Sequence, residues 1–244
     1  LLDVASCTEC GRCEMNCPAA ISGKVLSPRD IVLGLRTQVN AETPAFAAPL
    51  EGQRIMESSD SAISAEAIQV CTTCMACVEA CPAFIDPLSK ILEIRRNEVM
   101  IQDAFPETFA DVFNGIEKRG NPWNEHPTAR LEWARGLDVP VMADVAEEGK
   151  TVEYLFWVGC SAAFDPRNQK IARAMVKILQ TAGVEFAVLG EEERCTGDPA
   201  RRMGHEYLFA MQAESNVELL NEYQFGKILT ICPHCFNTFK NEYP

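Results

Sequence analysis

The chain has 244 residues, of which 47% are apolar and 23% charged, an ordinary balance for a globular protein long enough for two domains. Its formal net charge is −13 and it contains no run of Lys or Arg, which argues against a nucleic-acid partner, because such partners favour a basic face. No apolar stretch approaches the roughly 18 residues that a membrane-spanning helix needs, and no signal peptide is recognisable. Because the chain begins with Leu1 rather than Met, we expect it to be a fragment, or the ordered part, of a longer protein.

The twelve cysteines are the most informative part of the composition. In a small secreted protein this number would indicate a disulfide framework. Here the chain is long, its apolar content is normal, and the cysteines are spaced as metal ligands are. The sequence therefore favours metal-bound thiolates in a reducing compartment over disulfides.

Eight of the cysteines form two runs with one spacing, Cys-x2-Cys-x2-Cys-x3-Cys-Pro, at residues 7–18 and 71–82. This is the spacing of bacterial-type ferredoxins, which hold [4Fe–4S] clusters by thiolates. Four cysteines can also bind zinc, but zinc ribbons use two separated Cys-x2-Cys pairs. Iron–sulfur clusters are thus the preferred interpretation, with zinc as the alternative.

In two-cluster ferredoxins the first three cysteines of a run bind one cluster, and the cysteine before proline binds the other. The same crossing is predicted here, and it would tie the two runs together. The predicted ligands are Cys7, Cys10, Cys13 and Cys81 for the first cluster, and Cys71, Cys74, Cys77 and Cys17 for the second.

Residues 1–103 are predicted to form an α-helical ferredoxin-like domain. The 53 residues between the runs (18–70) form a longer and more helical insertion than compact bacterial ferredoxins have. Helices are predicted to begin at Ser27-Pro28, at Ser64 and at Asp86-Pro87, because Ser and Asp are good N-caps and Pro suits the first turn. A loop is predicted over residues 40–60.

Residues 104–150 have little periodicity and are predicted to be a connector without chemistry of its own. From residue 151 the pattern changes to alternating strands and helices, which predicts a small α/β domain over 151–244. Strands are expected at 152–159, 184–189 and 227–231. The overall fold class is therefore α+β and multidomain.

Two helices are expected in the α/β part. The first begins at Asp165-Pro166, and the second runs from Asp198-Pro199 to about Tyr223, before a terminating Gly226. Helical spacing predicts the side chains that face inward. They are Ile171, Ala174, Met175, Ile178 and Leu179 in the first helix, and Met203, Tyr207, Ala210, Met211, Val217 and Leu220 in the second.

The last four cysteines, Cys160, Cys195, Cys232 and Cys235, each follow a predicted strand or sit at its end. The carboxyl ends of parallel strands share one edge of a sheet, where ligands normally bind. Their convergence predicts a third metal centre. The pair Cys232-x2-Cys235 has a second interpretation as a thioredoxin-like redox motif, which the two partner cysteines make less favoured.

The pattern Cys160-x34-Cys195-Thr196-Gly197-x34-Cys232-x2-Cys235 resembles the cysteine-rich CCG domain. That domain marks the B and D subunits of heterodisulfide reductases, the iron–sulfur subunits of glycolate and lactate oxidases, and the iron–sulfur subunit of electron-transfer flavoprotein (ETF):menaquinone oxidoreductases. Two ferredoxin runs followed by such a domain is the order found in the D subunit of heterodisulfide reductases. The resemblance covers nearly the whole chain.

The sequence departs from the family in two respects. The double Cys of the family is Cys195-Thr196 here, so one ligand is absent, and a single cysteine-rich repeat is present where family members usually have two. With four ligands, a [4Fe–4S] cluster is the preferred occupant of the third centre; a [2Fe–2S] cluster, a non-cubane cluster and zinc are the alternatives. Thr196 is a candidate donor of a hydrogen bond to a cluster sulfur.

The resemblance implies an iron–sulfur electron-transfer subunit of an oxidoreductase complex. It would relay electrons between a flavoprotein (ETF or an FAD-containing 2-hydroxy-acid dehydrogenase) and a quinone pool. It implies a quinone-reactive membrane segment or subunit, and a cytoplasmic location, peripheral to or tethered at the inner face of the cell membrane. The alternative is a catalytic subunit that reduces a heterodisulfide. No catalytic residue is recognisable, because no Gly-rich phosphate loop or Ser/His/Asp set occurs.

Overall fold

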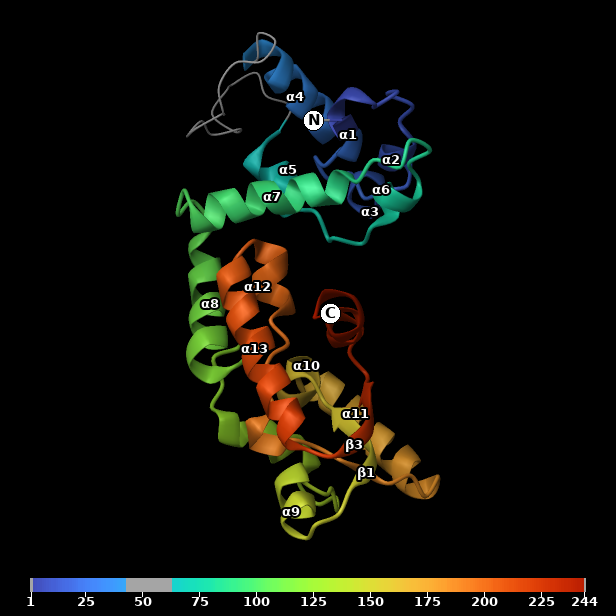
Figure 1. Cartoon of the computed structure of the whole chain (residues 1–244), viewed down its shortest axis with the longest axis vertical. Helices are drawn as coiled ribbons and strands as arrows, with labels where there is room; N and C mark the ends of the chain where they lie inside the picture. Colours follow the sequence, from blue (N-terminus) through green and yellow to red (C-terminus); the bar gives the residue numbers. More distant parts are fainter. Residues whose placement is uncertain (1, 43–62, 244) are drawn as a thin grey trace. The chain divides into compact units, whose positions relative to one another are not determined.

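The computed structural model describes residues 2–42 and 63–243. The chain divides into two compact units. Figure 1 shows the described elements, coloured by residue number. The first unit contains Leu1–Ala104 with Arg202–Gly204, and the second contains Phe105–Arg201 and His205–Pro244. Residues 105–150, which the sequence predicted as a connector, thus group with the second unit. Of the loop predicted over 40–60, only residues 40–42 are described, and they belong to a helix.

In its described residues the first unit is built from helices alone. Three of them begin at the predicted caps. Ser27 Oγ accepts a hydrogen bond from the backbone N–H of Asp30 (3.2 Å), Ser64 Oγ accepts one from Ala67 (3.1 Å), and Asp86 Oδ1 accepts one from Ser89 (2.9 Å). The helices are α1 (Leu2–Ala5), α2 (Arg12–Met15), α3 (Pro18–Ile21), α4 (Pro28–Glu42), α5 (Ala65–Gln69), α6 (Ala76–Glu79) and α7 (Pro87–Met100).

The first unit has an apolar core between its two long helices, α4 and α7. Ile31 on α4 and Ile91 on α7 are at most 1% exposed, as are Ile68 on α5 and Ile63 just before that helix. These branched side chains hold together a unit whose remaining helices have only four or five residues. Helices this short are not stable by themselves, so their positions depend on this packing.

The second unit contains a three-stranded parallel sheet with the order β2-β1-β3 and helices between the strands in sequence. Tyr154 of the central strand pairs with Phe186 on one side and Lys227 on the other. The elements, in chain order, are α8 (Glu107–Arg119), the 3-10 helix η1 (Pro127–Ala134), α9 (Met142–Glu147), β1 (Val152–Trp157), α10 (Cys160–Phe164), α11 (Pro166–Thr181), β2 (Phe186–Ala187), the 3-10 helix η2 (Gly190–Glu192), α12 (Asp198–Met203), α13 (Glu206–Glu222), β3 (Phe225–Thr230), α14 (Pro233–Asn237) and the π-helix η3 (Thr238–Glu242).

The predicted fold class, a helical ferredoxin part followed by a small α/β part, is confirmed. The long helix predicted from Asp198 is interrupted, because Gly204 has a φ of 97° and cannot continue a right-handed helix. His205 then caps α13. Gly226 lies inside β3 and does not end a helix. Its role is to let two strands approach closely, because a Cβ at this position would lie only 2.8 Å from the Glu153 carbonyl oxygen.

The inward faces of the two main helices are rotated from the prediction. Helix α11 buries Ala172, Val176 and Leu179, while Ile171 and Ile178 are 49% and 61% exposed. Helix α13 buries two polar residues, Gln212 and Asn216, with Leu208 and Phe209, and it exposes Tyr207, Met211 and Val217. For α13 the spacing of apolar residues predicted the wrong face, because Asn216 takes an inward position from which it bonds the Cys195 carbonyl oxygen. Within residues 2–42 and 63–243, no helix combines the length and apolarity that crossing a bilayer requires.

Candidate metal centres

The two cysteine runs of the first unit follow the same backbone path. Glu9 and Thr73, at equivalent places in the runs, have φ values of 59° and 56°, and Gly11 and Met75 have values of 76° and 65°. Residues other than glycine rarely adopt the left-handed backbone conformation. When left-handed and right-handed residues alternate, successive backbone N–H groups point toward one concave side. The Thr73 N–H accordingly donates to Cys71 Sγ at 3.4 Å.

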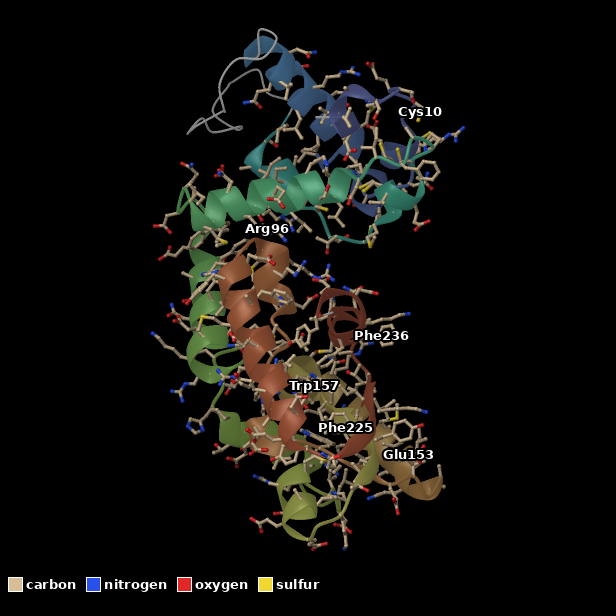
Figure 2. All side chains as sticks on the ribbon, in the orientation of Figure 1. Cys10, Arg96, Glu153, Trp157, Phe225 and Phe236 are labelled. Atoms are coloured by element: carbon tan, nitrogen blue, oxygen red, sulfur yellow. The ribbon has the colours of Figure 1, made fainter. Side chains whose placement is uncertain are left out.

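Two members of the first predicted ligand set pack against the same small apolar cluster. Cys7 and Cys81, from different runs, both pack against buried Val4, Val32 and Ile85. Cys13 interacts electrostatically with these two cysteines, and burial raises the pKa of its thiol. The fourth member, Cys10, is exposed on the loop before α2 (Figure 2).

The second predicted ligand set lines one pocket. All four cysteines face it, together with apolar side chains from α4 and α7. Burial raises the pKa of Cys77 to about 12, and the neighbouring thiols of Cys71 and Cys74 contribute to that rise. Cys17 and Cys71, from different runs, also share the main apolar core of the unit. The four cysteines of the pocket are Cys17, Cys71, Cys74 and Cys77.

In the second unit the last four cysteines converge at the carboxyl edge of the sheet. Cys160 begins α10 after β1, Cys195 lies in the loop after β2 and η2, and Cys232 caps α14 after β3. The thiol of Cys195 hydrogen-bonds to Cys160, which lowers the pKa of Cys160. Cys235 hydrogen-bonds to Cys232 and lowers the pKa of that thiol to about 5.

Hydrogen-bond donors surround these four sulfurs. The Thr196 hydroxyl donates to Cys235 Sγ at 3.9 Å, and Arg130 Nη2 donates to Cys160 Sγ at 3.1 Å. His234, although exposed, donates to Cys232 through its backbone and its side chain. Thr196 stands where the family has a second cysteine, and its side chain here has become a donor in place of a ligand.

The loop that carries Cys195 and Thr196 is held by buried polar side chains. Asn216 Nδ2 donates to the Cys195 carbonyl oxygen (2.9 Å) and to Tyr243 Oη (3.0 Å), and Tyr243 Oη donates to the Thr196 carbonyl oxygen (3.0 Å). Asn216 is fully buried. No local sequence pattern marks Asn216 for this role, because its two partners lie 21 and 27 residues away in the chain.

Two further residues beside Cys160 were not predicted from the sequence. Arg130, in the stretch predicted to have no chemistry, and Glu193 form an ion pair with a distance of 3.0 Å between Nη1 and Oε1, and both side chains are 2% exposed. The Glu193 carboxylate also accepts hydrogen bonds from the backbone of Val158 and Gly159. Glu193 follows two other glutamates and is not distinguishable from them in the sequence; Arg130 carries no signal at all.

The donor chemistry of the three sets fits iron–sulfur clusters. All twelve predicted ligands are cysteines, and thiolates select soft metals over Mg²⁺ or Ca²⁺. Among the described residues, no group of three or more His, Cys, Asp or Glu is arranged to hold a single metal ion. Zinc needs four sulfurs at about 2.3 Å from one point.

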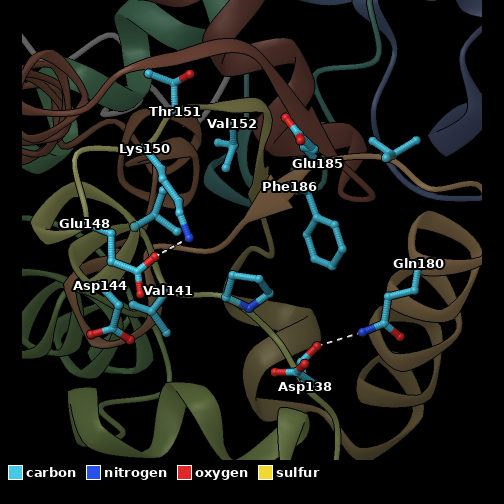
Figure 3. Close-up of a pocket in the computed structure, with 13 residues that line it drawn as sticks. Asp138, Val141, Asp144, Glu148, Lys150, Thr151, Val152, Gln180, Glu185 and Phe186 are labelled. Carbon is cyan, nitrogen blue, oxygen red and sulfur yellow. Dashed lines mark hydrogen bonds and ion pairs between the residues drawn. The ribbon is translucent and has the colours of Figure 1, made fainter.

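A separate pocket of about 560 Å³ lies at the amino ends of β1 and β2, away from the cysteines (Figure 3). Its lining includes the carboxylates of Asp144 and Glu148, and Lys150 Nζ lies 2.5 Å from the Glu148 carboxylate. Gln180 donates to the Asp138 carbonyl oxygen at 2.7 Å across the pocket wall. None of the cysteines lines this pocket, so it is not part of the proposed centres.

Comparisons with known proteins agree with this geometry. Residues 1–82 match the family described as "4Fe-4S dicluster domain", and residues 154–240 match CCG, described as "Cysteine-rich domain". The first match covers both cysteine runs of the first unit. The second covers the sheet and the four cysteines at its carboxyl edge.

Three curated relatives align along the whole chain. The chain is 38% identical to an EtfAB:quinone oxidoreductase of Syntrophomonas wolfei, over 37% of that protein's length. It is 39% identical to a probable membrane-anchored ferredoxin of Chromohalobacter salexigens, over 38% of its length. It is 30% identical to the D subunit of a dihydromethanophenazine:CoB–CoM heterodisulfide reductase of Methanosarcina barkeri, over 58% of its length.

The chain therefore spans about two fifths of the first two relatives and somewhat more than half of the third. The paired runs of the first unit and the cysteines at the sheet edge of the second coincide with the two family matches. One segment of the chain is therefore similar to 4Fe-4S dicluster domains and a later segment to CCG cysteine-rich domains, and the relatives that align along the whole chain are oxidoreductase components.

Proposed function

We propose that this chain is the electron-relay part of an oxidoreductase that connects a flavoprotein to a quinone pool. The observation that carries the proposal is the grouping of eleven of the twelve cysteines into three sets, two in the first unit and one in the second. Cys10 is assigned to the first set by its spacing in the run. Iron–sulfur clusters bound at such sites supply one-electron transfer. The residues contribute ligand thiolates, hydrogen bonds to sulfur and exclusion of water.

We further propose the ligand sets predicted from the sequence. Two [4Fe–4S] clusters would be held by Cys7, Cys10, Cys13 and Cys81, and by Cys71, Cys74, Cys77 and Cys17. The third centre would be held by Cys160, Cys195, Cys232 and Cys235, with a [4Fe–4S] cluster as the preferred occupant. Support for the crossing comes from the packing of Cys7 with Cys81 and of Cys17 with Cys71.

The proposed partners come from the names of the relatives. One relative is called an EtfAB:quinone oxidoreductase, which supports an electron-transfer flavoprotein as donor and a quinone as acceptor. Another is called a probable membrane-anchored ferredoxin, which supports attachment to a membrane, and the inner face of the cell membrane is the side that we propose. The quinone-reactive segment would then belong to the rest of the protein or to a partner.

Metal analysis tests the three-centre proposal. The full-length protein, purified without oxygen, is expected to hold about twelve irons and as many sulfides, at four per [4Fe–4S] centre. Cys160→Ser should disturb only the third EPR signal, and Cys13→Ser and Cys81→Ser should both disturb one and the same dicluster signal. If Cys13→Ser and Cys81→Ser disturb different signals, the crossed ligation is wrong.

The assay of function is electron transfer from reduced electron-transfer flavoprotein to a soluble menaquinone analogue. We expect turnover that is lost in the Cys13→Ser variant. A second candidate is heterodisulfide reduction, which the identity to the D subunit of a heterodisulfide reductase favours. The position of Thr196 counts against it, since the full double-cysteine motif is absent. Reduction of a CoM–CoB heterodisulfide by the purified protein, without turnover of the quinone, would reverse this ranking.

A further inference from the structure

A buried ion pair lies beside the four cysteines of the second unit. The side chains of Arg130 and Glu193 are 2% exposed, with Nη1 and Oε1 separated by 3.0 Å. Burying two charges costs free energy that their attraction often fails to recover, and apolar replacements of such pairs are frequently neutral or stabilising. A purely structural role is thus a weak explanation for this pair.

The guanidinium of Arg130 contacts two of the cysteine-bearing segments. Nη2 donates to Cys160 Sγ at 3.1 Å and to the Gly120 carbonyl oxygen at 3.0 Å. The same carbonyl oxygen accepts the backbone N–H of Cys195 at 2.7 Å. Arg130 therefore contacts Cys160 directly and is connected to the Cys195 segment through the Gly120 carbonyl oxygen. The planar guanidinium, with several N–H donors in a fixed arrangement, suits that geometry.

Glu193 fixes the arginine and the turn that precedes Cys160. Its Oε2 accepts the N–H of Val158 and its Oε1 accepts the N–H of Gly159, both at 2.8 Å. A Cβ at Gly159 would lie 3.4 Å from Cys235 Sγ, so this turn passes directly beside a third cysteine. With both oxygens occupied by the backbone, the carboxylate cannot swing away from Arg130.

The charges in this arrangement have opposite effects on reduction. An iron–sulfur centre gains negative charge when it is reduced, and hydrogen bonds and nearby charges set its potential. A cation in contact with a ligand sulfur favours the reduced state, and a buried anion disfavours it. Arg130 touches the sulfur, whereas Glu193 touches the backbone and the arginine.

We propose that Arg130, positioned by Glu193, sets the reduction potential of the third centre by donating a charged hydrogen bond to Cys160 Sγ. The inference rests on the proposed function, because it takes Cys160 to be a ligand of that centre. Arg130 is a positioning and electrostatic residue, and no proton or bond changes at it.

The test is an EPR-monitored redox titration of the full-length protein. Arg130→Gln should move the midpoint potential of the third centre to a more negative value. Glu193→Gln, which removes the anion and keeps the shape, should move it to a more positive value. Arg130→Lys keeps the charge without the fork, and should give a smaller negative shift than Arg130→Gln. The two dicluster signals serve as internal standards and should not move.

The exposed Arg167 gives the matched control, and Arg167→Gln should leave all three potentials unchanged. A purely structural pair would give no shift, or shifts of the same sign for Arg130→Gln and Glu193→Gln, and either result would overturn the inference. If Arg130→Gln loses the third centre, the shifts of Glu193→Gln and Arg130→Lys decide the matter. A wild-type protein with about eight irons and no third EPR signal would refute the third centre itself. That result would contradict the proposed function rather than the role of Arg130, and it would be known before any variant is made.

Discussion

The glycine that follows Cys195-Thr196 gives the sharpest test of how closely the second unit is built around its cysteines. Gly197 has a φ of 83°, and a Cβ at this position would lie 2.9 Å from Phe209 Cδ2 and 3.4 Å from Phe209 Cα. The Phe209 side chain is buried, and the guanidinium of Arg201 lies 4.6 Å from the centre of its ring. The ring is thus enclosed, and it can move away from Gly197 only by displacing its neighbours.

Gly197→Ala therefore combines two costs. The left-handed conformation costs a residue with a Cβ about 1–2 kcal/mol, and overpacking adds about 1–3 kcal/mol, so the variant should lose about 2–5 kcal/mol of unfolding free energy. Gly183 is the matched control: its φ is 66°, but no atom lies within 4 Å of its Cβ position. Gly183→Ala should lose only the conformational part, about 1–2 kcal/mol.

Urea unfolding of the metal-free chain, followed by tryptophan fluorescence, measures this difference. The three tryptophans, Trp123, Trp133 and Trp157, all belong to the second unit, so the signal reports that unit alone. Trp157 is fully buried (Figure 2 shows its position). Equal losses for the two variants would refute the packing argument and would mean that the loop moves away from Phe209 at little cost.

Three further predictions concern single residues. Gly11→Ala should destabilise the first unit by about 1–2 kcal/mol, whereas Met75→Gly at the equivalent left-handed position should not. The denaturant midpoint for loss of the visible cluster absorption measures both effects. A loss of stability in both variants would contradict the shared backbone path. Thr196→Val should shift the potential of the third centre negatively by removing the hydroxyl that donates to Cys235 Sγ, and Thr196→Ser should not. His205 caps α13 with its ring nitrogen, and burial lowers its pKa. Its protonation then favours the unfolded chain, so the second unit should lose stability as pH falls from 7 through the unfolded pKa of about 6.5, and His205→Asn should flatten that dependence in urea titrations at pH 5 and 7.

The sequence was most informative where one local spacing determines the chemistry. The two runs, the caps at Ser64 and Asp86 and the alternation of strand and helix after residue 151 each depend on residues close together in the chain, and all are present in the structure. The positive φ at Gly11 is what a glycine suggests, but the positive φ at Met75 was not predictable, because methionine gives no sign of a left-handed conformation.

The environment of the third set was less accessible from the sequence. Arg130 lies 30 residues from Cys160, and Asn216 lies 21 residues from Cys195, so no local pattern relates them. Their roles follow from tertiary contacts alone. The same contacts explain the wrong inward face of α13, because a buried amide that bonds a loop carbonyl replaces the apolar residue that a helix pattern would place there.

The distribution of cysteines along the chain also has a consequence for biogenesis. The first three cysteines of each run lie within seven residues, so they can meet as soon as that short stretch leaves the ribosome. The last four come from three parallel strands, and a further 36 residues separate Cys195 from Cys232. Contacts between distant residues form late in folding, because closing a long loop costs entropy before any bond is gained. In the crossed arrangement proposed above, each triplet still lacks the cysteine of the other run, so neither centre of the first unit can be complete before Cys81 is made. The third centre must wait longer, until β3 has joined the sheet.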